Sequence, residues 1–207
     1  DCPALYDREG LYGADGRDHP DNPTRFGLLV RAALDLAAAT EGPPSIVHAH
    51  DWQAALGPVM LSAGLPGLER LRGSASVQTI HNLAYQGVFP LGCLGALGLA
   101  EAPGVACTLT HKAGVSFLKG GIAYSDAVTT VSPGYAREIL GAELGRGLDA
   151  SLRDRGSDLS GILNGIDVDV WDPATDPYLP APFSAGDLEG KRAAKRAVLE
   201  CYGLPTD

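Results

Sequence analysis

Short β-branched runs alternate along the chain with longer runs rich in alanine and leucine. The short apolar runs predict strands at 45–49, 75–80, 127–131 and, very short, 161–163. The longer runs predict helices at 25–39, 54–63 and 111–124, one opening at Pro133, and a charged amphipathic one at 187–200. This alternation predicts an α/β fold in which a parallel sheet carries helices on both faces.

Polar, Gly-rich and Pro-rich segments separate these elements. Residues 1–23 and 81–110 lack apolar periodicity and are expected to be loops, the second with room for one short helix. Thr24 is the expected N-cap of the first long helix. The Pro-rich stretch 172–186 is typical of a linker, so we expect a partial first domain over 1–165 and a crossover segment with its helix over 166–207.

Composition narrows the class of protein. With 45% hydrophobic and 20% charged residues, the 207-residue chain is expected to be globular, and it has no apolar run of the ~18 residues that a membrane span needs. A net charge of −9 disfavours nucleic acid as a partner. Four cysteines without a C-x-x-C pair are expected to be free, mostly buried thiols of a cytoplasmic protein. The first residue is not methionine, so the chain is interpreted as a piece of a longer protein.

Polar residues that could bind a ligand or take part in catalysis directly follow the predicted strands. His50-Asp51 follows the first strand, His81-Asn82 the second, Ser132 the third and Asn164 the fourth. Because ligands of parallel α/β sheets bind beyond the carboxyl ends of the strands, these residues are the candidate site.

Four segments together resemble bacterial glycogen synthases and plant starch synthases: HAHDWQAAL (48–56), TIHNLAYQGVFP (79–90), FLKGGIAYSDAVTTVSPGYAREIL (117–140) and LSGILNGIDVDVWDPATDPYL (159–179). Their order and spacing match over nearly the whole chain, which makes the set specific. The resemblance implies a GT-B fold of two Rossmann-like domains, with this chain holding the later part of the first and the crossover to the second.

The resemblance also implies the activity. Enzymes of this family transfer glucose from ADP-glucose to the non-reducing end of an α-1,4-glucan, with retention and without a metal or other cofactor. Two phosphate-handling elements of the family are absent here: an upstream K-x-G-G-L loop and the C-terminal domain. We therefore expect these 207 residues alone to be inactive. Lys119-Gly120-Gly121 mimics the loop at the wrong position and is expected to be structural.

Residue roles are carried over from the family motifs position by position. His81 is expected to be catalytic and to hold the donor glucose, with Asn82 and Asn164 as further donor contacts. Asp51 is expected to be catalytic on the acceptor side, where its carboxylate can accept sugar hydroxyls. The other expected acceptor contacts are aromatic or amide side chains, Tyr6, Trp52, Tyr85 and Gln86, although Trp52 could be a core aromatic and the last two could simply shape their loop.

Two other classes of function stay open on the sequence. His48-x-His50-Asp51 after a strand also resembles the opening of a metal-dependent hydrolase site, because two imidazoles two residues apart point the same way and could share Zn²⁺. His81, His111 and Asp126 could complete such a site. Alternatively, the chain is only a glucan-binding half-site. A phosphorylase is disfavoured, since no lysine is a candidate for its pyridoxal group.

Overall fold

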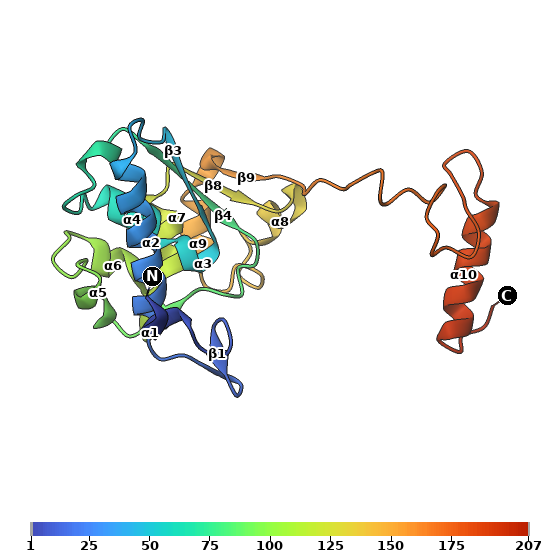
Figure 1. Ribbon diagram of the computed structural model, residues 1–207, viewed down its shortest axis with the longest axis horizontal. Helices are drawn as coiled ribbons and strands as arrows, with labels where there is room; N and C mark the ends of the chain where they lie inside the picture. The colour runs from blue at the N-terminus through green and yellow to red at the C-terminus, as the bar shows by residue number, and fades with distance from the viewer. Residues whose placement is uncertain (1, 207) are drawn as a thin grey trace. The chain divides into compact units, whose positions relative to one another are not determined.

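The computed structural model describes residues 2–206, which divide into two compact units between Leu163 and Asn164 (Figure 1). The first unit holds the sheet and most helices. The second holds an irregular segment and one helix. Each unit is described by itself.

A four-stranded parallel sheet forms the centre of the first unit, in the order β3-β4-β8-β9 (Figure 1). Its strands are Ile46–His50, Ala75–Ile80, Ala127–Thr130 and Leu159–Gly161. His50 is in register with Thr79, and Thr79 with Thr129, so the carboxyl ends of β3, β4 and β8 lie at one edge of the sheet. The first three strands are close to the prediction. The fourth begins two residues earlier than predicted.

Helices flank this sheet, as the alternating pattern predicts. The main ones are α2 (Asn22–Ala39), α3 (Asp51–Ala54), α4 (Leu56–Ser62), α7 (Phe117–Tyr124), α8 (Pro133–Glu138) and α9 (Asp149–Arg153). Single-turn elements complete the unit: α1 (Pro3–Tyr6), α5 (Cys93–Ala96), α6 (Val105–Leu109) and the 3₁₀ turns Glu69–Leu71 and Gly156–Asp158. α3 and α4 both pack on α7, and α2 packs on α3 and α4. The expected α/β fold with a parallel sheet is confirmed.

The long helix α2 begins earlier than the sequence indicates. It starts at Asn22, with Pro23 in its first turn, and Asp21 is the flanking residue. Thr24 therefore lies inside the helix and does not cap it, so that prediction is wrong. The physical reason is that proline suits the first helical turn, where its missing N–H has no intrahelical acceptor.

Two small antiparallel sheets were not predicted. β1 (Gly13–Ala14) pairs with β2 (Arg17–Asp18), and β7 (Gly114–Ser116) pairs with both β5 (Val88–Phe89) and β6 (Thr110–His111). The predicted helix over 111–124 is thus wrong in its first half. α7 begins only at Phe117, where Ser116 acts as the N-cap and its hydroxyl accepts the Lys119 N–H at 3.1 Å.

The core lies between the sheet and the helices that pack on it. Phe117, Ile122, Leu56, Met60 and Ile80 are fully buried and belong to one apolar cluster. Burial of this cluster fixes α4 and α7 against the strands, and thereby fixes the strand ends that carry the candidate site.

Gly121 of α7 offers a test of this packing and of the structural role expected for Lys119-Gly120-Gly121. A Cβ added at Gly121 would lie 2.3 Å from Gln78 Oε1 and 2.8 Å from Ala55 Cβ. Gly121→Ala is therefore expected to lower the free energy of unfolding by about 1–3 kcal/mol. Urea unfolding would measure this. Gly73→Ala is the control, because its Cβ would meet no atom within 4 Å. Equal stability of the two variants would contradict the prediction.

The second unit contains α10 (Glu189–Cys201), close to the predicted 187–200. Before it, an isolated antiparallel bridge joins Ser184 and Asp187. Several large apolar side chains between residues 166 and 178 are exposed, namely Ile166, Val168, Val170, Trp171 and Tyr178. Within residues 2–206, no helix is long and apolar enough to cross a membrane.

The four cysteines are free thiols, as expected. The expectation that they are mostly buried is wrong. Cys2 and Cys93 are half-buried, and Cys107 and Cys201 are exposed. Cys107 is exposed although Val105 and Leu109 of the same short helix are buried in the apolar cluster, and Cys201 is the last residue of α10, so composition alone misplaces both.

Candidate functional site

The junction of β3 and α3 places Asp51 at the carboxyl edge of the sheet in an unusual conformation. Its φ is +52°, in the left-handed region that non-glycine residues rarely adopt. Two hydrogen bonds hold it: Asp51 Oδ1 accepts the His81 backbone N–H at 2.8 Å, and the Asp51 carbonyl accepts Gln78 Nε2 at 3.2 Å. Because such backbone strain persists only where surrounding contacts enforce it, it marks Asp51 as a candidate functional residue.

Three histidines form a row beside Asp51. The rings of His48 and His50 stack with centroids 4.2 Å apart, and His50 Nδ1 lies 3.0 Å from His81 Nε2. His48 Nε2 lies 2.6 Å from Thr79 Oγ1. In the His50–His81 pair one nitrogen donates and the other accepts, so the bond couples the tautomers of the two rings and orients the His81 imidazole.

This row does not have the arrangement of a metal site. His48 and His50 lie face to face, and His50 directs a ring nitrogen to His81. Among residues 2–206, no three His, Cys, Asp or Glu side chains are grouped so that they could hold a metal ion. The hydrolase alternative built on His48, His50 and Asp51 therefore gains no support from the geometry.

A cavity of about 640 Å³ opens next to Asp51. Five of the expected site residues line it, and they come from the two strand-end segments: Asp51, Trp52, Asn82, Tyr85 and Gln86. Carboxylate and amide groups thus face the same space as an aromatic ring. Polar groups that can bond hydroxyls, next to aromatic faces, are suited to a sugar.

The aromatic and amide residues of the cavity differ in what they can offer a ligand. Trp52 is only 8% exposed and packs edge-on against Phe26 at 4.6 Å, so most of its ring belongs to the core. Tyr85 is 65% exposed and has a free face for stacking. Gln86 is buried, and its Nε2 donates to the Arg146 carbonyl at 3.2 Å, which fixes the loop.

Three expected site residues lie elsewhere. His81 is exposed beside the cavity and is joined to it through its bond to Asp51. Tyr6 is not among the lining residues, and its hydroxyl donates to the Arg25 carbonyl. Asn164 belongs to the second unit.

The cavity also includes four residues with polar side chains that the sequence reasoning missed: Tyr12, Asp18, Asn22 and Gln53. Tyr12 directly precedes β1 and Asp18 is the last residue of β2. The two-residue turn of this hairpin is Asp15-Gly16, with both φ angles positive, +52° and +73°. An Asp-Gly pair is a strong hairpin signal, and it could have located this element.

The histidine row predicts a pH dependence of stability. Desolvation lowers the pKa of His50, and the neighbouring imidazoles of His48 and His81 lower it further, against the opposing effect of the Asp51 carboxylate. A base whose pKa is lowered by folding binds protons more tightly in the unfolded chain. Stability should therefore fall as pH drops below the ordinary value of 6.5. His50→Asn is expected to reduce this fall, which Tm values across that pH range would measure. An unchanged slope would contradict the prediction.

Fold and cavity together define the class: an α/β protein with a cavity at the carboxyl edge of a parallel sheet, lined by carboxylate, amide and aromatic groups. The starch synthase catalytic domain family matches residues 1–154, and the chain belongs to this family.

Relatives and a solved structure agree with this assignment. The chain is 54% identical over 198 residues to the glycogen synthase of Anaeromyxobacter dehalogenans (strain 2CP-1), covering 96% of this chain and 42% of the relative. It is 48% identical over 211 residues to that of Roseobacter denitrificans, covering 99% and 42%. The catalytic domain of starch synthase IV from Arabidopsis thaliana, solved bound to ADP and acarbose, superposes with a TM-score of 0.67 at 38% identity, covering 91% of this chain and 39% of that one. The chain thus spans about two-fifths of the length of these relatives.

Proposed function

We propose that the full-length protein transfers glucose from ADP-glucose to the non-reducing end of an α-1,4-glucan, with retention at the anomeric carbon. In this reaction the bond from the glucose C1 to the diphosphate oxygen breaks, a bond from C1 to the acceptor hydroxyl oxygen forms, and the hydroxyl proton passes to the departing diphosphate or to solvent as ADP is released. The relatives named glycogen synthase support the reaction. The ADP and acarbose of the Arabidopsis structure support a nucleotide donor and a glucan acceptor.

The observation that carries the proposal is the cavity beside Asp51. A carboxylate and the Asn82 amide can bond sugar hydroxyls there, while the exposed Tyr85 ring can stack on a pyranose face. We assign this cavity to the acceptor glucan. His81, whose backbone N–H bonds the Asp51 carboxylate, is assigned to the donor glucose, and Asn164 is proposed as a second donor contact.

Charge stabilisation and positioning supply most of the rate in such transfers. The residues of this chain would orient the acceptor hydroxyl and the donor sugar. We propose that the remaining part of the full-length protein binds the diphosphate, so that both parts are needed for turnover. The alternative, a glucan-binding half-site without transfer, rests on the fact that the cavity is lined by the first unit alone.

The test is incorporation of labelled glucose from ADP-glucose into glycogen by the purified full-length protein, with UDP-glucose as the comparison donor. We expect incorporation from ADP-glucose and a much lower rate from UDP-glucose. Absence of incorporation together with measurable maltoheptaose binding would overturn the transferase proposal and favour the half-site. A preference for UDP-glucose would overturn the donor assignment.

A further inference from the structure

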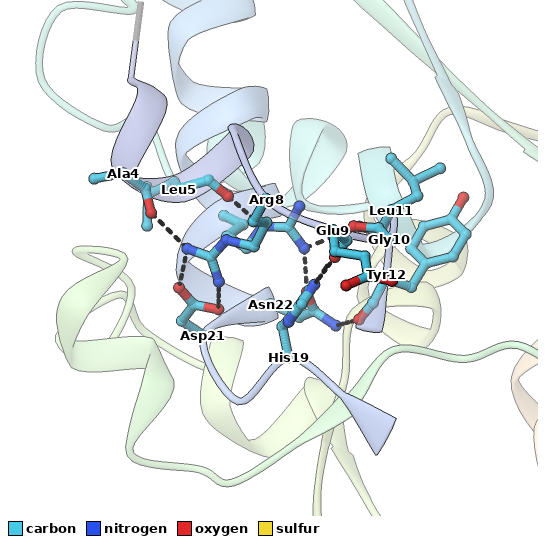
Figure 2. Close-up of polar contacts among 11 residues, drawn as sticks. Ala4, Leu5, Arg8, Glu9, Gly10, Leu11, Tyr12, His19, Asp21 and Asn22 are labelled. Atoms are coloured by element: carbon cyan, nitrogen blue, oxygen red, sulfur yellow. Dashed lines mark hydrogen bonds and ion pairs between the residues drawn. The ribbon is translucent and has the colours of Figure 1, made fainter. Parts of the chain in front are cut away.

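The loop that carries Tyr12 to the cavity is held by side chains from the first turn of α2, and Figure 2 shows its polar contacts. Asn22 Nδ2 donates to the Tyr12 carbonyl at 2.8 Å. Arg25 donates from Nε to the Leu5 carbonyl at 2.8 Å and from Nη1 to the Leu11 carbonyl at 3.0 Å. Both ends of the segment from Leu5 to Tyr12 are thus bonded to one helical turn.

Arg25 is unusual because it is a buried cation that bonds only neutral groups. It is 2% exposed, and the ion pairs in the described part of the chain do not include it. Its third acceptor is Asn22 Oδ1, 2.6 Å from Nη1, and its guanidinium lies 5.7 Å from the centre of the Tyr6 ring. A buried charge is costly unless its donors are satisfied. The loop carbonyls and the Asn22 side chain satisfy the donors on Nε and Nη1.

Asn22 links this buried cation to the cavity wall. Its side-chain oxygen accepts from Arg25, while its side-chain nitrogen donates to the backbone of Tyr12. The Tyr12 hydroxyl accepts a further hydrogen bond from Gln53 Nε2 at 3.0 Å, and its ring centroid lies 6.1 Å from that of Trp52. Backbone and phenol of Tyr12 are therefore fixed by separate contacts.

We propose that Arg25 and Asn22 are positioning residues of the sugar cavity. They hold the Leu11–Tyr12 backbone so that the Tyr12 phenol and Asp18 complete the wall that Asp51 and Asn82 begin. Neither guanidinium nor loop carbonyl needs to touch the ligand for this role. The inference rests on the proposed function, because it takes the ligand of the cavity to be a glucan.

The first test needs no ligand and uses hydrogen exchange of residues 5–19 in the full-length protein. Asn22→Asp keeps the acceptor for Arg25 and removes the donor to Tyr12. Arg25→Lys keeps the charge and removes the guanidinium group, whose Nε and Nη1 reach two carbonyls. Both variants should exchange this segment about tenfold faster, the effect of losing one such bond. Arg31→Lys, on the exposed side of the same helix, is the matched control and should leave it unchanged.

The second test measures the Kd of maltoheptaose for the same variants. Asn22→Asp should raise it about tenfold, with the KM for ADP-glucose unchanged. Combined with Tyr12→Ala, Asn22→Asp should add little further loss, because coupled residues are non-additive. Unchanged exchange and Kd in Asn22→Asp would overturn the proposal, even if Arg25→Lys fails to fold. A full additive loss in the double variant would overturn it as well.

The outcomes separate this inference from the proposed function. If the wild-type protein binds maltoheptaose but transfers no glucose, the transferase proposal fails and the Kd comparison still decides the role of Asn22. If the wild-type protein does not bind maltoheptaose, the glucan-positioning role is overturned together with the acceptor assignment, whatever the exchange rates.

Discussion

Replacing His81 by alanine in the full-length protein is expected to lower kcat well over tenfold, roughly the loss seen when one group acting on developing charge is removed. The imidazole stands at the carboxyl end of β4, where its Nε2 lies 3.0 Å from His50 Nδ1. Because the side chain is exposed, its removal leaves no core cavity. The backbone N–H that bonds Asp51 is retained in the variant. The fold should therefore persist while turnover falls.

Steady-state kinetics with ADP-glucose and glycogen, together with Tm, would measure this effect. The alanine variant keeps the backbone carbonyl of residue 81, so it isolates the contribution of the imidazole. Near wild-type kcat would remove the His81 side chain from the site. A low kcat accompanied by a large drop in Tm would instead show that His81 supports the structure.

Replacing Asp51 by alanine is expected to raise the KM for glucan about tenfold or more, with little change in the KM for ADP-glucose. The carboxylate lines the cavity assigned to the acceptor, and its Oδ1 accepts the His81 N–H. Asp51→Asn separates these roles, because an amide oxygen can still accept that N–H and asparagine tolerates the left-handed backbone. It should keep the fold and lose the charge.

Asp35→Asn is the matched control for Asp51. Asp35 pairs with Arg31 on the exposed face of α2, and such pairs contribute little, so neither KM should change. Initial rates at varied glucan and varied ADP-glucose would resolve the two constants. A selective rise in the KM for ADP-glucose in Asp51→Ala would contradict the acceptor assignment and move the carboxylate to the donor side.

The longer strands of the parallel sheet were predictable from the sequence, and so were the polar residues that follow β3 and β4. β4 was predicted over the residues that form it, because ASVQTI is bounded by a glycine-serine pair and by His81-Asn82. The parallel arrangement then brings Asp51 and Asn82 to one edge, and both line one cavity. The strand pattern thus predicts where these side chains lie, and it does not predict what they do in a reaction. The roles of His81 and Asp51 in the reaction remain predictions.

Elements of two or three residues were not predictable from periodicity. His111 and Gly114 pair across a tight turn at Lys112-Ala113, and so short a ladder shows no alternation. The hairpin at Asp15-Gly16 carried a local signal, but its place on the cavity did not follow from it. That place depends on Arg25, whose charged side chain a sequence pattern assigns to a solvated helix face.

Two sets of contacts hold the N-terminal loop, and they respond differently to pH and salt. Arg25 and Asn22 bond uncharged carbonyls, so acid and salt should barely loosen them. The second set is the ion pair of Arg8 with Asp21, in which Arg8 Nη1 and Nη2 each lie 3.0 Å from one carboxylate oxygen. Although burial raises the pKa of Asp21, its bonds to Arg8 lower it overall. This contribution is lost as pH falls through the lowered pKa of Asp21, and it weakens as salt rises. Acid strong enough to protonate Asp21, or high salt, would thus free the rim of the loop while the segment at the sugar cavity stays in place.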